Sequence, residues 1–171
     1  MKLQISPFRW LRQSMVDDES AVTTAYIAGL LDTRGSLSVS AQQNQQTRHG
    51  FGIHTDFRVR INREIVMAFF DDWCIQNGIY SNVRETDAGN FIVTITRRDD
   101  IARICEIIGP YSLALAPDME LYVDEIYPRL EEGENETAEG IVEIIELAEQ
   151  LSSWTENRDY DSETLKEQLG V

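Results

Sequence analysis

The chain has 171 residues, a length typical of one domain, and its 42% hydrophobic content is enough to bury a core. No run reaches the ~18 to 20 apolar residues that cross a bilayer, and "MKLQISPFRWLRQSM" lacks an apolar run before a small-residue cleavage site. We therefore expect a soluble, cytoplasmic protein with no membrane partner and no evident small-molecule substrate. Cys74 and Cys105 lie in apolar stretches without CxxC spacing, which predicts buried reduced thiols rather than a metal site.

The net charge of −15 is the strongest compositional signal, and it is unevenly distributed. Residues 110–171 hold 17 acids against 3 bases, whereas residues 34–63 hold five arginines against the single acid Asp56. Only Lys2 and Lys166 are lysines. This acidic, lysine-poor composition is similar to that of proteins from salt-in halophilic archaea, where molar salt shortens the Debye length to ~3 Å. Acidity therefore does not exclude a DNA partner.

Residues 20–33 carry apolar side chains at helical spacing, which predicts a helix with small residues on one side. These small residues are Ala25, Ala28 and Gly29. Such a side admits the close approach of another backbone. That backbone is either the sheet of the same chain or a second copy of the helix.

After Gly35 the hydrophobic period becomes two, which predicts a strand with Leu37, Val39 and Ala41 toward the core. The polar stretch "QQNQQTRHG" predicts a hairpin tip, and residues 51–61 predict a second strand whose outward face is polar and partly basic. One side of this hairpin is therefore expected to face solvent. It is either a plain solvated sheet face or a binding surface.

The pattern continues with a helix in "NREIVMAFFDDWCIQNG" that ends at Gly78, followed by two strands in "YSNVRET" and "NFIVTIT". Asp99 or Asp100 is expected to cap the next helix, and a further helix is expected from Pro117 through Leu130.

An acidic connector leads to two final helices, at about residues 137–153 and 161–169. The element order αββαββα, with these C-terminal helices, predicts one α+β domain over residues 20–171. Residues 1–19 form an N-terminal extension to it.

The segment "YIAGLLDTRGS" resembles the LAGLIDADG motif of homing endonucleases, and the element order over about residues 20–169 is that of their fold, with an antiparallel, saddle-shaped sheet. The resemblance is closest to the single-motif members, which work as homodimers. It implies a dimer interface that includes Ala25, Ala28, Gly29 and Asp32. It also places Asp32 at the first acidic position of the motif and Arg34 at the catalytic acidic position.

Arg34 departs from what the resemblance requires. A guanidinium group stays protonated and has no lone pair for Mg²⁺, which takes oxygen ligands. The resemblance also places Ile61 where the family has a polar residue, and "PYSLALAPDMELY" lacks the lysine that the family often supplies. We therefore expect no catalytic residue, no bound metal and no cofactor; Mg²⁺ would be needed only if the chain were a nuclease.

The resemblance further implies that outward-facing residues of the sheet contact double-stranded DNA. Arginine suits guanine edges and phosphates, and Gln, Asn and Ser suit base edges. The expected DNA-binding residues are Arg34, Ser38, Ser40, Gln42, Asn44, Arg48, His54, Arg58, Arg60, Arg84, Thr94 and Thr96. Arg34 is expected to contact a phosphate and add affinity without taking part in catalysis. The alternative is that Arg34 arose by neutral drift after catalysis was lost.

Together these features predict a catalytically inactive, homodimeric LAGLIDADG-type DNA-binding protein that acts as a regulator or an architectural factor. Two alternatives stay open. One is a metal-dependent site-specific DNA endonuclease with a rearranged active site that uses Asp32 or Asp56. The other is a protein-interaction module in which the sheet or the acidic helices dock a partner.

Overall fold

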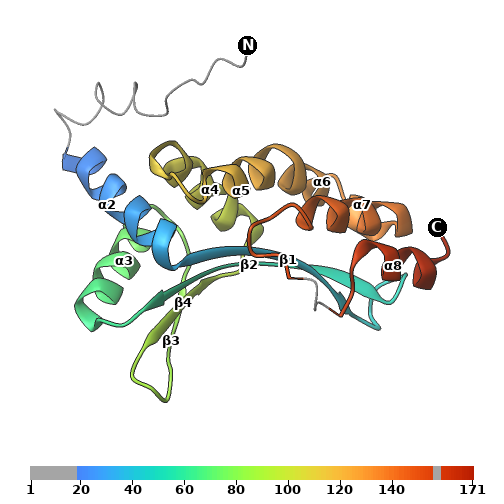
Figure 1. Ribbon diagram of the computed structural model, residues 1–171, viewed down its shortest axis with the longest axis horizontal. Helices are drawn as coiled ribbons and strands as arrows, with labels where there is room; N and C mark the ends of the chain where they lie inside the picture. Colours follow the sequence, from blue (N-terminus) through green and yellow to red (C-terminus); the bar gives the residue numbers. More distant parts are fainter. Residues whose placement is uncertain (1–18, 156–158) are drawn as a thin grey trace, which may run out of the picture.

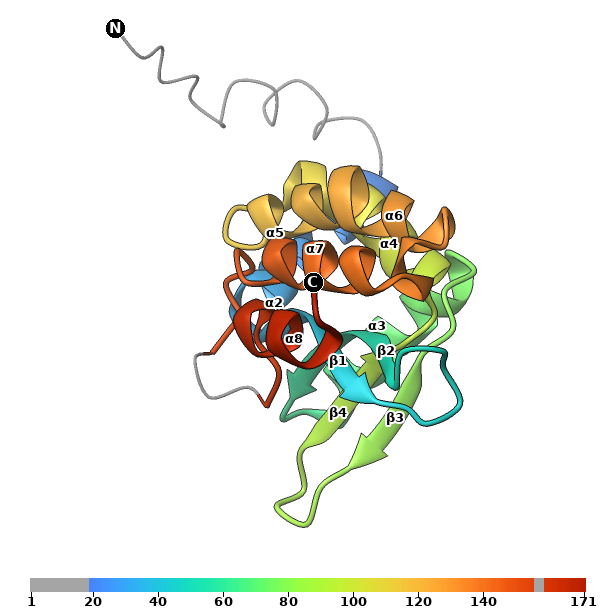
Figure 2. The same ribbon diagram turned by 90° about the vertical axis from the view of Figure 1, so that its right-hand side faces the viewer.

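The computed structural model describes residues 19–155 and 159–171. A layer of helices covers one face of a curved, four-stranded antiparallel sheet, and the other face of the sheet is open (Figure 1). The turned view shows the same two layers, with one hairpin projecting away from the helices (Figure 2). The predicted N-terminal extension lies outside the described residues, except for Glu19.

The motif segment forms helix α2 (Glu19–Arg34), which passes directly into strand β1 (Gly35–Gln43). A Cβ atom at Gly35 would lie 2.7 Å from the backbone oxygen of Leu31, so the abrupt change from helix to strand requires glycine there. Strand β2 (Phe51–Ile61) returns antiparallel to β1. The predicted helix, strand and hairpin are therefore confirmed.

Alternation along β1 and β2 separates the two faces of the sheet. Leu37 and Val39 on β1, and Phe57 and Val59 on β2, have no exposed surface and lie in the core under the helices. The residues between them point to the open face. Period-two patterning thus places the polar side chains of this hairpin together on one side.

The second half of the sheet follows helix α3 (Glu64–Gln76), which ends before Gly78 at a φ of +69°. Strands β3 (Asn82–Glu85) and β4 (Phe91–Ile95) then form the projecting hairpin. β4 pairs with β2, which gives the strand order β1-β2-β4-β3. The first two strands therefore lie beside the second two in one continuous sheet.

The helical layer begins with α4 (Arg98–Ile108) and a 3-10 turn (Gly109–Tyr111). Helix α5 (Ala116–Leu121) then passes through a π-helical turn (Tyr122–Ile126) into α6 (Tyr127–Glu131). The wider π turn ends two residues before Pro128, whose ring would clash with the carbonyl four residues earlier in a regular helix. After a 3-10 turn, the described C-terminal helices are α7 and α8. They span Ala138–Ala148 and Ser162–Leu169.

Two predicted helix ends are wrong. Neither Asp99 nor Asp100 caps α4, because both lie inside its first turn. Asp99 instead accepts a hydrogen bond from the Tyr127 hydroxyl, and Asp100 accepts one from the backbone N–H of Tyr80. The helix expected over residues 137–153 ends at Ala148, because the chain turns where Asp118 of α5 accepts hydrogen bonds from the backbone N–H and the hydroxyl of Ser152.

The core between sheet and helices contains both cysteines as free, buried thiols, as expected. Burial raises the pKa of each thiol well above its ordinary value. No helix among the described residues is long and apolar enough to cross a membrane.

Candidate nucleic-acid interface

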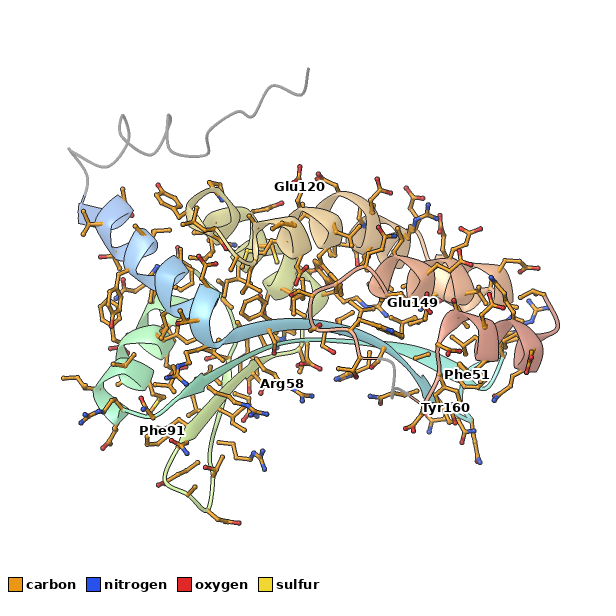
Figure 3. The ribbon with its side chains drawn as sticks, viewed as in Figure 1. Phe51, Arg58, Phe91, Glu120, Glu149 and Tyr160 are labelled. Carbon is orange, nitrogen blue, oxygen red and sulfur yellow. The ribbon has the colours of Figure 1, made fainter. Side chains whose placement is uncertain are left out.

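The open face of the sheet brings together most of the residues expected to contact DNA. Strand register sets them in rows across the sheet, because paired strands place the facing residues side by side. Ser40 lies opposite His54, Arg58 lies opposite Thr94, and Arg60 lies two residues further along β2. Figure 3 shows Arg58 on this open side. The remaining expected residues of the sheet are Ser38 and Gln42 on β1, Arg84 on β3, and Thr96 directly after β4.

Two expected residues lie in the loop that joins β1 to β2. The side chain of Asn44 accepts a hydrogen bond from the backbone N–H of Gln46 and so shapes the loop. Arg48 lines a pocket of about 370 Å³ together with Asn135 and Glu136 from the helical layer. Arg48 therefore lies apart from the rows on the strands.

Arg34 ends helix α2 at the opposite end of the sheet. With Arg60 it lines an open pocket of about 430 Å³, whose other polar walls are Asn62, Thr86 and Asn90. Phe91, also in the wall, marks this end of the sheet in Figure 3. Both arginines are exposed, and neither has an ion-pair partner among the described residues. The pocket therefore offers donors and positive charge, which suits an anion such as a phosphodiester.

The Asp32 carboxylate is hydrogen-bonded to the loop that precedes α5. Its carboxylate accepts hydrogen bonds from the Ser112 hydroxyl and from the backbone N–H groups of Leu113 (2.8 Å), Ala114 (3.1 Å) and Leu115 (3.2 Å). Burial raises the pKa of Asp32, but these four hydrogen bonds outweigh it and the pKa lies below its ordinary value. The carboxylate thus joins the end of α2 to the loop before α5.

Asp56 is the other carboxylate that the nuclease alternative requires. It lies on the open face of β2, yet it is only 3% exposed. Arg58 Nε lies 2.8 Å from its Oδ1 atom, and Arg58 Nη2 donates to Oδ2 at 3.1 Å. This pairing was not foreseen from the sequence; two opposite charges two residues apart on one strand, and so on one face, are the pattern that could have revealed it.

The residues at the end of α2 do not fit a divalent metal. The pocket beside Arg34 has no carboxylate or imidazole in its walls. No group of three His, Cys, Asp or Glu side chains that could hold a metal occurs within residues 19–155 and 159–171. Asp32 and Asp56, the two carboxylates named by the nuclease alternative, are both engaged in contacts inside the chain.

Four exposed residues of α2, namely Val22, Tyr26, Gly29 and Thr33, form a stripe along the helix. A Cβ atom on Gly29 would meet nothing within 4 Å. Tyr26, which is 53% exposed, packs edge-on against Phe69 of α3, and Phe69 is itself 42% exposed. The chain thus presents a partly apolar stripe with a glycine near its middle.

Ala28 is a correction to the expected dimer interface. Its side chain has no exposed surface and packs in the core of the same chain. Each residue turns a helix by about 100°, so Ala28 lies well round from Gly29 and faces inward. Ala25, at the edge of the stripe, is partly exposed, and Asp32 is engaged with the loop before α5.

No protein-family model and no curated protein sequence matches the chain. Solved structures do. The archaeal intron-encoded homing endonuclease I-Vdi141I, complexed with DNA, superposes with a TM-score of 0.75 at 18% identity, over 89% of this chain and 97% of that one. The homing endonuclease I-CvuI, solved with DNA and Mg, gives a TM-score of 0.74 at 15% identity, over 88% and 94%.

Longer enzymes match over part of their length. The LAGLIDADG homing endonuclease I-LtrWI, bound to target DNA, gives a TM-score of 0.70 at 17% identity, over 81% of this chain but 47% of that one. This chain therefore spans about half of I-LtrWI and nearly all of I-Vdi141I. With the motif at α2, the strand order of the sheet and these superpositions, the chain has the fold of the LAGLIDADG homing endonucleases.

Proposed function

We propose that this protein is a catalytically inactive, homodimeric DNA-binding protein that acts as a regulator or an architectural factor. The observation that carries the proposal is the pocket at the end of α2. There Arg34, which stands where the resemblance places a metal-binding carboxylate, shares the pocket with Arg60 and two Asn side chains. A pocket of this kind suits a phosphate by charge and hydrogen bonds, whereas its two arginines disfavour a cation and it has no carboxylate to bind one.

DNA is the proposed partner because the open face has the right shape and chemistry. The structural neighbours I-Vdi141I and I-LtrWI are described as bound to DNA. On this chain the equivalent sheet presents Arg, His, Ser and Thr side chains in rows set by strand pairing. Such side chains contact phosphates and base edges, and a two-stranded ribbon fits the major groove.

A homodimer is proposed because one chain supplies half of what the longer enzymes contain. I-LtrWI is matched over 47% of its length, so two copies of this chain would equal one such enzyme. The stripe on α2 supports this arrangement, since Gly29 leaves room for a second backbone to approach. Two copies would also double the length of DNA covered.

Substitution of Arg34 by Asp tests the role of the pocket. We expect Arg34→Asp to weaken binding to random-sequence duplexes about 10- to 100-fold in the presence of a chelator, because a charge-assisted contact is lost and a repulsion is added. Binding is measured by fluorescence anisotropy.

The matched control is Arg103→Asp, which makes the same charge change at an exposed position on α4, in the helical layer. Equal affinities of wild type and Arg34→Asp for DNA would contradict the proposed contact between Arg34 and a phosphate. Equal losses in both variants would show that only net charge matters.

A further inference from the structure

Asp56 is a buried carboxylate on the open face of the sheet, where its strand neighbours Arg58 and His54 are exposed or partly exposed. Its side chain is 4% exposed, whereas that of Arg58 is 54% exposed and that of His54 is 40% exposed. Removing a charged carboxylate from water is costly unless an opposite charge lies beside it. The position of Asp56 therefore depends on its neighbours along β2.

Arg58 supplies that charge from two residues further along the same strand. Its Nη2 atom donates to Oδ2 at 3.1 Å, and its Nε atom makes an ion-pair contact of 2.8 Å with Oδ1. Oδ1 is buried and accepts no hydrogen bond within the described chain, so the guanidinium group alone balances it. His54 Nε2, on the other side, lies 3.5 Å from Oδ2.

This pairing decides which edge of the guanidinium group is left for another molecule. Nε and Nη2 are turned toward Asp56, so the outer edge, with both N–H groups of Nη1 and the second of Nη2, remains available. Two parallel N–H donors at that edge match the O6 and N7 acceptors of guanine. A side chain already held in place also loses less freedom when it binds.

The location of Arg58 suits base reading better than phosphate contact. It lies on β2, an inner strand of the sheet, between Ser36 of β1 and Thr94 of β4. Figure 3 shows it on the open side. Arg34 and Arg60, in contrast, line the pocket at one end of the sheet and have no carboxylate in its walls to orient them.

We infer that Asp56 is a positioning residue that holds Arg58 in a fixed orientation to read one G·C base pair in the DNA. The inference rests on the proposed function and adds a specificity determinant to it. Asp56 itself does not touch the DNA, because its carboxylate lies beneath Arg58 and His54.

Selection of duplexes from a random pool tests this assignment with wild type, Asp56→Asn and Arg58→Lys. We expect wild type to select guanine at a defined position in each half-site. Both variants should lose that preference by about tenfold or more while keeping the preferences at other positions. A merely structural role of Asp56 would instead weaken binding to all duplexes in parallel.

The control is Arg103→Lys, the same substitution at an exposed residue of α4 in the helical layer, which should leave the guanine position unchanged. Circular dichroism checks folding, and Arg58→Lys replaces an exposed side chain, so the reading role of Arg58 is tested even if Asp56→Asn folds poorly. Undiminished guanine preference in Arg58→Lys, or in folded Asp56→Asn, would overturn the inference while leaving DNA binding intact. Failure of wild type to retain any duplex would overturn the proposed function and this inference with it.

Discussion

Two acidic side chains, Asp32 and Asp118, each accept several hydrogen bonds from the chain itself. Asp32 accepts from three consecutive backbone N–H groups, and Asp118 accepts from the backbone N–H and the hydroxyl of Ser152. Each carboxylate fixes a turn in the helical layer. The first acidic residue of the motif is therefore a structural residue here.

Asp32→Asn is expected to lower the free energy of unfolding by about 1 to 3 kcal/mol at pH 7, because charge-assisted hydrogen bonds become neutral ones. The pKa of Asp32 is lowered in the folded protein, so its ionised form stabilises the fold above the unfolded pKa, roughly 3.9. That stability is lost as the pH falls through the folded pKa. The difference between wild type and variant should therefore shrink below about pH 4.

Denaturant titration at pH 7 and at acidic pH measures this difference. Asp72→Asn serves as the control, since Asp72 is exposed on α3 and its carboxylate accepts no hydrogen bond from any residue that the structure describes. Equal stability of Asp32→Asn and wild type at pH 7 would contradict the assignment.

At the level of elements, hydrophobic patterning was sufficient to predict the helices and strands and which face of β1 and β2 is buried. Leu37 and Val39 alternate with serines along the strand, and alternation directly reports which side faces the core. Patterning could not predict the hydrogen bonds of Asp32 and Asp100. The donors to Asp32 lie up to 83 residues away in the chain, and the donor to Asp100 lies 20 residues away. Only the packed structure brings these partners together.

The small residues of α2 show the same limit. The motif groups Ala25, Ala28 and Gly29, but only Gly29 lies on the fully exposed stripe, and Ala28 is in the core. Local spacing locates small residues on a helix, whereas the packing of the sheet and α4 decides which of them face outward.

Gly29→Arg tests whether the α2 stripe is the interface of the proposed dimer. A Cβ atom at position 29 would meet nothing within 4 Å in one chain, and Arg is the better helix former by about 0.7 to 1 kcal/mol, so the single chain should fold at least as well. A bulky charged side chain would, however, keep a second α2 from approaching. We expect wild type to be dimeric and Gly29→Arg to be monomeric by sedimentation velocity.

Gln150→Arg, an exposed position just after α7, provides the same added charge away from α2 and should stay dimeric. If Gly29→Arg is still dimeric, the α2 stripe is not the dimer interface.

Across the whole molecule, charge is divided between the two layers. Glu120 lies on the outer side of the helices and Arg58 on the open side of the sheet (Figure 3). The described acids of the helical layer account for much of the net charge of −15. At low ionic strength this field would repel DNA from the basic face, and molar salt would remove most of the repulsion. The lysine-poor composition is consistent with a protein adapted to such salt, which we propose as its working condition.

The most direct test of the account is a single assay of DNA binding and nicking with purified protein in molar KCl, with and without Mg²⁺. We predict that a fraction of a random duplex pool is retained equally in both conditions and that no strand is nicked. Among the described residues, Asp32 and Asp56 are both engaged within the chain and the pocket beside Arg34 has no carboxylate in its walls, so added metal should change neither result. Nicking that appears only with Mg²⁺ would contradict the account and make the protein an active endonuclease.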